Sequence, residues 1–292
     1  MPTLGDDVNE VGFYLIEQTQ HCPKLVSLNA VLDEQEQDGI LSFLRSRIQI
    51  PLEQLSVPFA WFSEISWKVL KEHHFSTLRL LSLQSPSVDG EVVHDILCSL
   101  PKLETLVAPW LRDYDIDSRP WICSGLRRLT VCIDLIKKAS QRVICLRLSK
   151  LTQLRYLDLT KTSKYFIDYR LKAEVVAQLK FAINHGLGLL KTLVSLEQLC
   201  LCDTGQLLTE EDVEWMLENW RRLRTVDGPL ANDRRLDREL RELLTQNGVG
   251  MLFPEGWRKL QKDGGVGGVP GPRTWAMSES DAGTKKCSKL AF

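Results

Sequence analysis

Several motifs that indicate catalysis or the binding of nucleotides and metals are missing from this 292-residue sequence. It contains no G-x-S-x-G, Walker A, H-E-x-x-H or EF-hand pattern, so the common hydrolase, nucleotide, zinc-protease and calcium sites lack their motifs. The eight cysteines form no C-x-x-C pair, and no cysteine or histidine set has the spacing of metal ligands. We therefore predict no catalytic residue, no cofactor and no metal, and we expect the cysteines to stay reduced.

Long apolar runs and an excess of either charge are also missing. No apolar run approaches the roughly 18 residues of a membrane span, and the acidic start MPTLGDDVNE lacks the features of a secretory signal. Lysine and arginine total 37 against 38 aspartate and glutamate residues, a formal net charge of −1. This balance gives no bulk electrostatic reason to bind nucleic acid or an anionic membrane. We expect a cytoplasmic or nuclear protein with neither kind of partner.

A leucine pattern recurs along most of the chain. The stretch LTQLRYLDLT places Leu154, Leu157 and Leu159 in the order L-x-x-L-x-L. Related stretches begin at residues 25, 52, 78, 103, 126, 154, 196 and 223, with gaps of 27, 26, 25, 23, 28, 42 and 27 residues. Without the gap of 42, the remaining gaps average 26. This value falls within the period of leucine-rich repeats, ~20–29 residues with one strand and one helix or 3-10 turn per repeat.

The repeat predicts the fold. A strand with apolar residues at positions 1, 4 and 6 cannot bury them alone, but stacked strands form a parallel sheet with a continuous apolar interior. We predict an α/β leucine-rich-repeat solenoid, a horseshoe of about eight or nine irregular repeats, with the parallel sheet on its concave face and helices on its convex face. Apolar residues at helical spacing support the helices and occur in the stretches 8–25, 35–48, 88–103, 208–223 and 236–248.

The ends of the chain differ from its middle. Residues 236–253 combine a charged helix, the stop Asn247–Gly248 and an apolar strand, which suits a C-terminal cap. From Pro254 the composition turns to Gly, Pro, Ser and Lys without periodicity. We predict a solenoid with its cap over 1–253 and a disordered tail over 254–292. Because the first helix starts near residue 8 without a capping segment, one interpretation is that the chain is part of a longer protein.

The gap of 42 residues allows two interpretations. Its apolar residues at helical spacing predict a helix several turns long over 171–187. Either residues 160–195 form one enlarged repeat with an overhanging helix, which we favour, or they contain a degenerate extra repeat.

With catalytic motifs missing, the candidate site is a surface. In L-x-x-L-x-L strands the intervening side chains face the open side of the sheet, and aromatic residues and arginines are the usual anchors of protein interfaces. We predict partner-binding residues on the concave face at Arg128, Tyr156, Asp158 and Gln198, and on the loop after the fourth strand at Trp110, Arg112 and Tyr114. The acidic residues beside Tyr114, Asp113 and Asp115, are interpreted as a solvated loop.

The repeats carry a family resemblance. LPKLETL, LTQLRYLDLT and the run EDVEWMLENWRRLRTVDG over 211–228 resemble the repeat region of fungal F-box/leucine-rich-repeat proteins of the ribonuclease-inhibitor-like class. The resemblance covers roughly residues 8–253. It implies a non-catalytic protein-protein interaction scaffold that recognises substrates for a ubiquitin ligase, with a protein partner on the concave face. We expect a monomer.

Two points qualify the resemblance. No F-box pattern of the L-P-x-E-[IL] type precedes Leu25, so the adaptor of a cullin-RING ligase would be a partner only if a longer parent carries an F-box. The alternative function is a regulator, of the GTPase-activating type, of a small GTPase. That function needs a positioned Arg or Asn, and Arg128 is the concave-face arginine that we can place.

Overall fold

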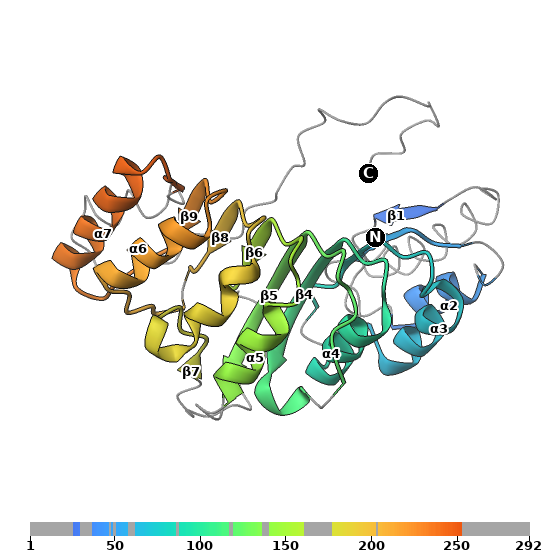
Figure 1. Ribbon diagram of the computed structural model, residues 1–292. Coiled ribbons are helices and arrows are strands. Elements are labelled where there is room, and N and C mark those ends of the chain that lie inside the picture. The colour runs from blue at the N-terminus through green and yellow to red at the C-terminus, as the bar shows by residue number, and fades with distance from the viewer. Residues whose placement is uncertain are drawn as a thin grey trace, which may run out of the picture. The chain divides into compact units, whose positions relative to one another are not determined.

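The structure of the chain is a computed structural model (Figure 1). It describes residues 26–29, 37–46, 48, 51–57, 62–85, 88–116, 119–135, 140–160, 177–202 and 204–252. The chain divides into two units, Met1–Phe253 and Pro254–Phe292, and every described residue lies in the first. The predicted tail and the predicted helix over 8–25 lie outside the described residues.

Parallel strands form the framework. Within the described residues a parallel sheet runs through nine strands in chain order: β1 (Ser27–Asn29), β2 (Gln54–Ser56), β3 (Leu80–Ser82), β4 (Thr105–Arg112), β5 (Arg128–Leu135), β6 (Tyr156–Asp158), β8 (Gln198–Cys200), β9 (Thr225–Asp227) and β10 (Gly250–Leu252). A further short strand, β7 (Ala177–Gln178), pairs antiparallel with β5. The sheet confirms the α/β class and is consistent with a leucine-rich-repeat-like solenoid. The horseshoe curvature stays a prediction.

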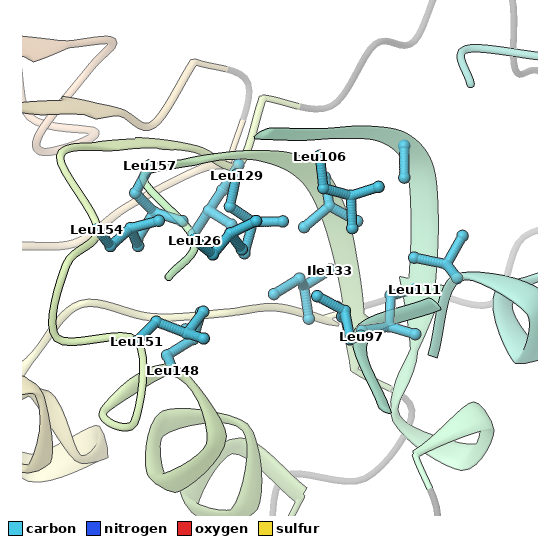
Figure 2. Close-up of a cluster of buried hydrophobic side chains, with 14 of the residues drawn as sticks. Leu97, Leu106, Leu111, Leu126, Leu129, Ile133, Leu148, Leu151, Leu154 and Leu157 are labelled. Carbon is cyan, nitrogen blue, oxygen red and sulfur yellow. The ribbon is translucent and has the colours of Figure 1, made fainter. Parts of the chain in front are cut away.

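The register explains why the fourth position of each repeat is apolar and in most repeats leucine. Pairing aligns one apolar residue per strand in a single row: Leu28, Leu55, Leu81, Leu106, Leu129, Leu157, Leu199, Val226 and Met251. The residues from Leu55 to Val226 in this row are at most 1% exposed. Figure 2 shows Leu106, Leu129 and Leu157 beside the first-position leucines Leu126 and Leu154. Each repeat therefore buries its leucines against those of its neighbours, which is the main source of stability.

Helices cover one side of the sheet (Figure 1). The α-helices are α2 (Gln37–Ser46), α3 (Glu64–His74), α4 (Gly90–Ser99), α5 (Ser140–Leu148), α6 (Glu210–Asn219) and α7 (Arg234–Gln246), and the 3-10 helices are η1 (Asp113–Asp115), η2 (Ile183–His185) and η3 (Leu187–Thr192). The apolar spacing correctly predicted α2, α4, α6 and α7. In α6 the Thr209 side chain accepts a hydrogen bond from the Asp212 amide, while the Asp212 carboxylate accepts one from the Thr209 amide, a capping box that fixes its start.

The long helix predicted over 171–187 is wrong where the structure describes it. Residues 177–192 form β7, an extended stretch and the helices η2 and η3. Gly186 has φ +103°, a left-handed conformation that ends η2 and interrupts a continuous helix. Strand β6 pairs directly with β8, so the enlarged-repeat interpretation agrees with the sheet. Residues 161–176 lie outside the described residues.

Candidate binding surface

Two rows of side chains flank the buried leucine row. One contains Ser27, Gln54, Leu80, Thr105, Arg128, Tyr156, Gln198, Thr225 and Gly250, and the other contains Asn29, Ser56, Ser82, Val107, Thr130, Asp158, Cys200 and Asp227. Successive side chains of a strand point to opposite faces, so both rows point away from the leucines. We call the face that carries these rows the open face.

Four predicted residues meet at the centre of the open face. Arg128, Tyr156 and Gln198 are register neighbours on β5, β6 and β8, and Asp158 follows on β6. The Arg128 guanidinium carbon lies 4.3 Å from the centroid of the Tyr156 ring, a cation–π contact. The Tyr156 hydroxyl donates to Asp158 Oδ2 at 3.2 Å. Burial and the Asp158 carboxylate raise the pKa of Tyr156, so its hydroxyl stays protonated as a donor.

Asp158 is held in place by Thr160. The Thr160 amide and hydroxyl both donate to Asp158 Oδ1, at 2.9 and 2.5 Å. The Thr160 hydroxyl also lies 3.1 Å from Cys200 Sγ, and the Cys200 thiol donates to Cys202 Sγ at 3.5 Å. This hydrogen bond to Cys202 and burial raise the pKa of Cys200, which favours the neutral thiol. All cysteines of the described part are free.

Trp110 and Arg112 do not lie on a loop, so that prediction is wrong. Strand β4 continues to Arg112, and its last three residues pair with β5. The register shifts between Val107 and Trp110, where β4 carries one extra residue and Pro109 cannot donate to the ladder. The extra residue shifts the inside–outside alternation of β4 by one position. As a result, Trp110 and Arg112 lie on the opposite side of the strand from the buried Leu111.

The second group of predicted residues is an arginine between two aromatic rings. The Arg112 guanidinium carbon lies 4.1 Å from the centroid of the Trp110 ring and 5.6 Å from that of Tyr114. Arg112 Nη1 also donates to the Tyr114 hydroxyl. Tyr114 belongs to η1 and is 55% exposed. Along the strands, this group begins four residues beyond the position of Arg128, a separation of roughly 13 Å. The structure thus separates the seven predicted residues into two groups.

The acidic residues beside Tyr114 are not solvated, which corrects a further prediction. Asp113 and Asp115 are only 8% and 6% exposed, and the Arg112 amide donates to Asp115 Oδ2 at 2.8 Å. A Cβ atom on Gly90 would lie 1.8 Å from Asp115 Oδ2 and 2.9 Å from the Trp110 ring. Burial raises the pKa of Asp115 to about 6. The start of α4 therefore packs directly on the residues that support the Trp110 group.

Sequence reasoning missed a row of charged side chains at the edge where the strands begin. The row holds the second residue of each repeat from the second repeat onward: Glu53, Arg79, Glu104, Arg127, Arg155, Glu197 and Arg224. The amide of each residue from Arg79 onward donates to the carbonyl of the preceding member, at 2.7 or 2.8 Å. We call it the edge row. The sequence could have predicted this row, because each member directly follows the first leucine of its repeat. Within the strands, the predicted binding residues were instead taken from positions 3 and 5.

A pocket of about 620 Å³ lies between the enlarged repeat and the start of α6. Its polar side chains hold the backbone. Gln141 Nε2 donates to the Lys180 and His185 carbonyls at 2.8 and 2.6 Å, and Asp212 Oδ1 accepts from the Ile183 amide at 2.8 Å. The buried Gln206 accepts from the Phe181 amide at 2.9 Å. These contacts fix an irregular segment, which gives the polar residues a structural role.

Two kinds of feature are absent from the described residues. No cluster of three or more His, Cys, Asp or Glu side chains suited to a metal ion occurs in that part of the chain. None of the helices described in the structure has the length and apolar character needed to cross a membrane.

Comparisons with known proteins add a weak structural likeness. No family model matches the chain, and no curated protein matches it. Among solved structures, the chain is similar to one in the crystal structure of the Rad7 and Elc1 complex in yeast. The TM-score is 0.43 and the sequence identity 15%, over 85% of this chain and 72% of that chain. At this similarity the comparison carries no argument about function.

Proposed function

We propose that this chain is a non-catalytic protein-interaction scaffold that holds a partner protein on its open face. The observation that carries the proposal is the contact between Arg128 and Tyr156, on strands where the leucines are buried and the flanking rows are not. Arginine and aromatic residues dominate the energetics of protein interfaces. A guanidinium already stacked on a ring loses little freedom on binding, so the surface is preorganised.

The finer proposal is that the partner is a substrate of a ubiquitin ligase. It rests on the likeness of the leucine repeats to those of F-box/leucine-rich-repeat proteins. The alternative, a regulator of a small GTPase, gains no support from the geometry. Arg128 lies over a neighbouring ring on the open face and does not extend from a loop, whereas an arginine finger must reach into another protein's site.

Affinity purification from native cells followed by mass spectrometry tests the proposal. The tagged full chain would be compared with the double variant Arg128→Ala, Gln198→Ala, since both residues are exposed on the open face. The control is Arg142→Ala, an equally exposed arginine on helix α5. We expect one or more proteins to be lost from the double variant by roughly tenfold and retained by the control.

The identities of those proteins decide between a substrate receptor of a ubiquitin ligase and a free-standing interaction module. A cullin-RING adaptor together with the lost protein supports the ligase proposal. A lost protein without any adaptor supports a free-standing interaction module. If wild type, double variant and control retain the same proteins in equal amounts, the open face does not bind a partner and the proposed function fails.

A further inference from the structure

The edge row begins with Glu53, which is followed by two Arg–Glu–Arg triads placed end to end. In the first, Glu104 lies between Arg79 and Arg127, and its carboxylate oxygens are 3.0 and 3.5 Å from the two guanidinium nitrogens. In the second, Glu197 lies between Arg155 and Arg224 in the row, and its carboxylate is 3.9 Å from the Arg155 guanidinium. Each triad has one more positive than negative charge.

The triads meet at two arginines. The Arg155 amide donates to the Arg127 carbonyl at 2.8 Å, so the two residues lie side by side on neighbouring strands, ~4.8 Å apart. Like charges in adjacent positions of a sheet are unfavourable. Their ion pairs are the longer ones of the row, and their side chains are 55% and 56% exposed. Arg128 follows Arg127 and carries a third guanidinium, which lies over the Tyr156 ring on the adjoining open face. We call Arg127, Arg128 and Arg155 the arginine junction.

The surroundings of the junction reinforce its positive potential. Apart from the edge row itself, the described turns that lead into the strands carry four basic residues and no acidic one: Lys102, Lys150, Arg221 and Arg222. The net charge of −1 hides this local excess, because acidic residues gather elsewhere, as in the first turn of α6. That acidic turn is explained by the helix dipole, whereas the junction arginines belong to the strand side of each repeat.

We infer that the arginine junction binds an acidic side chain of the partner polypeptide. This inference rests on the proposed function and adds the chemistry of the partner. Two guanidinium groups one strand apart can share a single carboxylate, which would offset their mutual repulsion and form charge-assisted hydrogen bonds. The stack of Arg128 on Tyr156 holds the third guanidinium on the adjoining part of the open face.

The glutamates of the edge row favour a polypeptide over a nucleic acid. A continuous phosphate backbone crossing the strands would bring charges close to Glu104 and Glu197 as well as to the junction. A polypeptide can present one or two carboxylates at the junction and neutral residues on either side. The glutamates on either side of the junction therefore select for spaced negative charge and against a uniform polyanion.

Fluorescence anisotropy with the full chain tests the inference. The probe is a short labelled peptide of alternating Glu and Gly, with the Gln/Gly peptide as its neutral counterpart and a short single-stranded deoxythymidine oligonucleotide as the competing class. The junction variant is Arg127→Gln, Arg155→Gln. The matched control, Arg79→Gln, Arg224→Gln, removes the same charge from the outer ends of the triads. Melting temperatures verify that both variants fold.

We expect wild type to bind the Glu/Gly peptide at low salt and the junction variant to bind it at least roughly tenfold more weakly. The control should lose no more than about threefold, and salt near 300 mM should weaken wild-type binding. Equal losses in both variants, no binding of the Glu/Gly peptide by wild type, or tighter binding of the oligonucleotide would each overturn the inference. If such a result accompanies loss of the cellular partner from the Arg128→Ala, Gln198→Ala variant, the proposed function stands and only the acidic recognition fails.

Discussion

Three glycines provide a graded test of how tightly successive repeats pack. Gly228 follows β9, has φ +97°, and a Cβ atom there would lie 2.6 Å from the backbone nitrogen of Cys202 in the neighbouring repeat. Gly248 also has positive φ, +78°, but a Cβ atom would have no neighbour within 4 Å. Gly125 has neither constraint.

The expected magnitudes follow from these differences. An alanine at left-handed φ costs about 1–2 kcal/mol, and forcing an extra carbon into a packed site costs about 1–3 kcal/mol more. The clash at Gly228 involves backbone atoms, which cannot move without disturbing the pairing of β8 with β9. We therefore expect Gly228→Ala to destabilise the fold by about 2–5 kcal/mol. Gly248→Ala should cost about 1 kcal/mol, and Gly125→Ala should be neutral or slightly stabilising.

Chemical denaturation of the full chain measures the three free energies of unfolding, and thermal melting gives an independent ranking. The midpoint temperature of a domain this size shifts by about 2–4 °C per kcal/mol. A Gly228→Ala variant that is no less stable than Gly248→Ala would refute the reasoning. It would show that the close approach of the two backbones is not required for the repeats to stack.

Further predictions concern buried polar groups. Because burial raises the pKa of Asp115 to about 6, above its unfolded value near 3.8, the native state takes up a proton that the unfolded state does not as pH falls from 7 to 5. Stability should therefore rise over that window in wild type and less so in Asp115→Asn, as followed by urea melts at each pH. Gln206→Leu leaves the buried Phe181 amide without its acceptor and should cost about 1–3 kcal/mol, with faster hydrogen exchange at that amide, whereas unchanged exchange would contradict the hydrogen bond. Although burial alone would raise the pKa of Asp95, its hydrogen bonds from Lys71, Trp67 and Arg119 lower it to about 2. Asp95→Asn should therefore destabilise the protein at pH 7 by roughly 1–2 kcal/mol and matter little below pH 2, and a pH-independent effect would argue against the ion pairs.

Some of the predicted binding residues follow from the repeat pattern, and others depend on features that the pattern does not show. The repeat pattern predicted that Arg128, Tyr156, Asp158 and Gln198 point away from the buried leucines, because each occupies a fixed position of a regular repeat. The group around Trp110 was misplaced because a bulge at Pro109 extends β4, and no pattern of leucines marks a bulge. The edge row was missed for another reason. Its charges look ordinary within any one repeat, and only the stacking of the repeats brings the two junction arginines together.

The sequence by itself determined the repeat, the parallel stacking and the side of each strand that is buried. Leucines at positions 1, 4 and 6 leave no other way to remove them from water, so spacing alone dictates that part of the fold. Tertiary structure decided what the leucines do not constrain. In the enlarged repeat, the left-handed Gly186 interrupts the predicted helix. Buried Gln206 satisfies backbone groups there, so hydrogen bonds to a distant side chain replace those of a helix. Whether two arginines become neighbours depends on which strands pair, and residues such as Arg127 and Arg155, 28 positions apart in the chain, meet only once β5 and β6 are aligned.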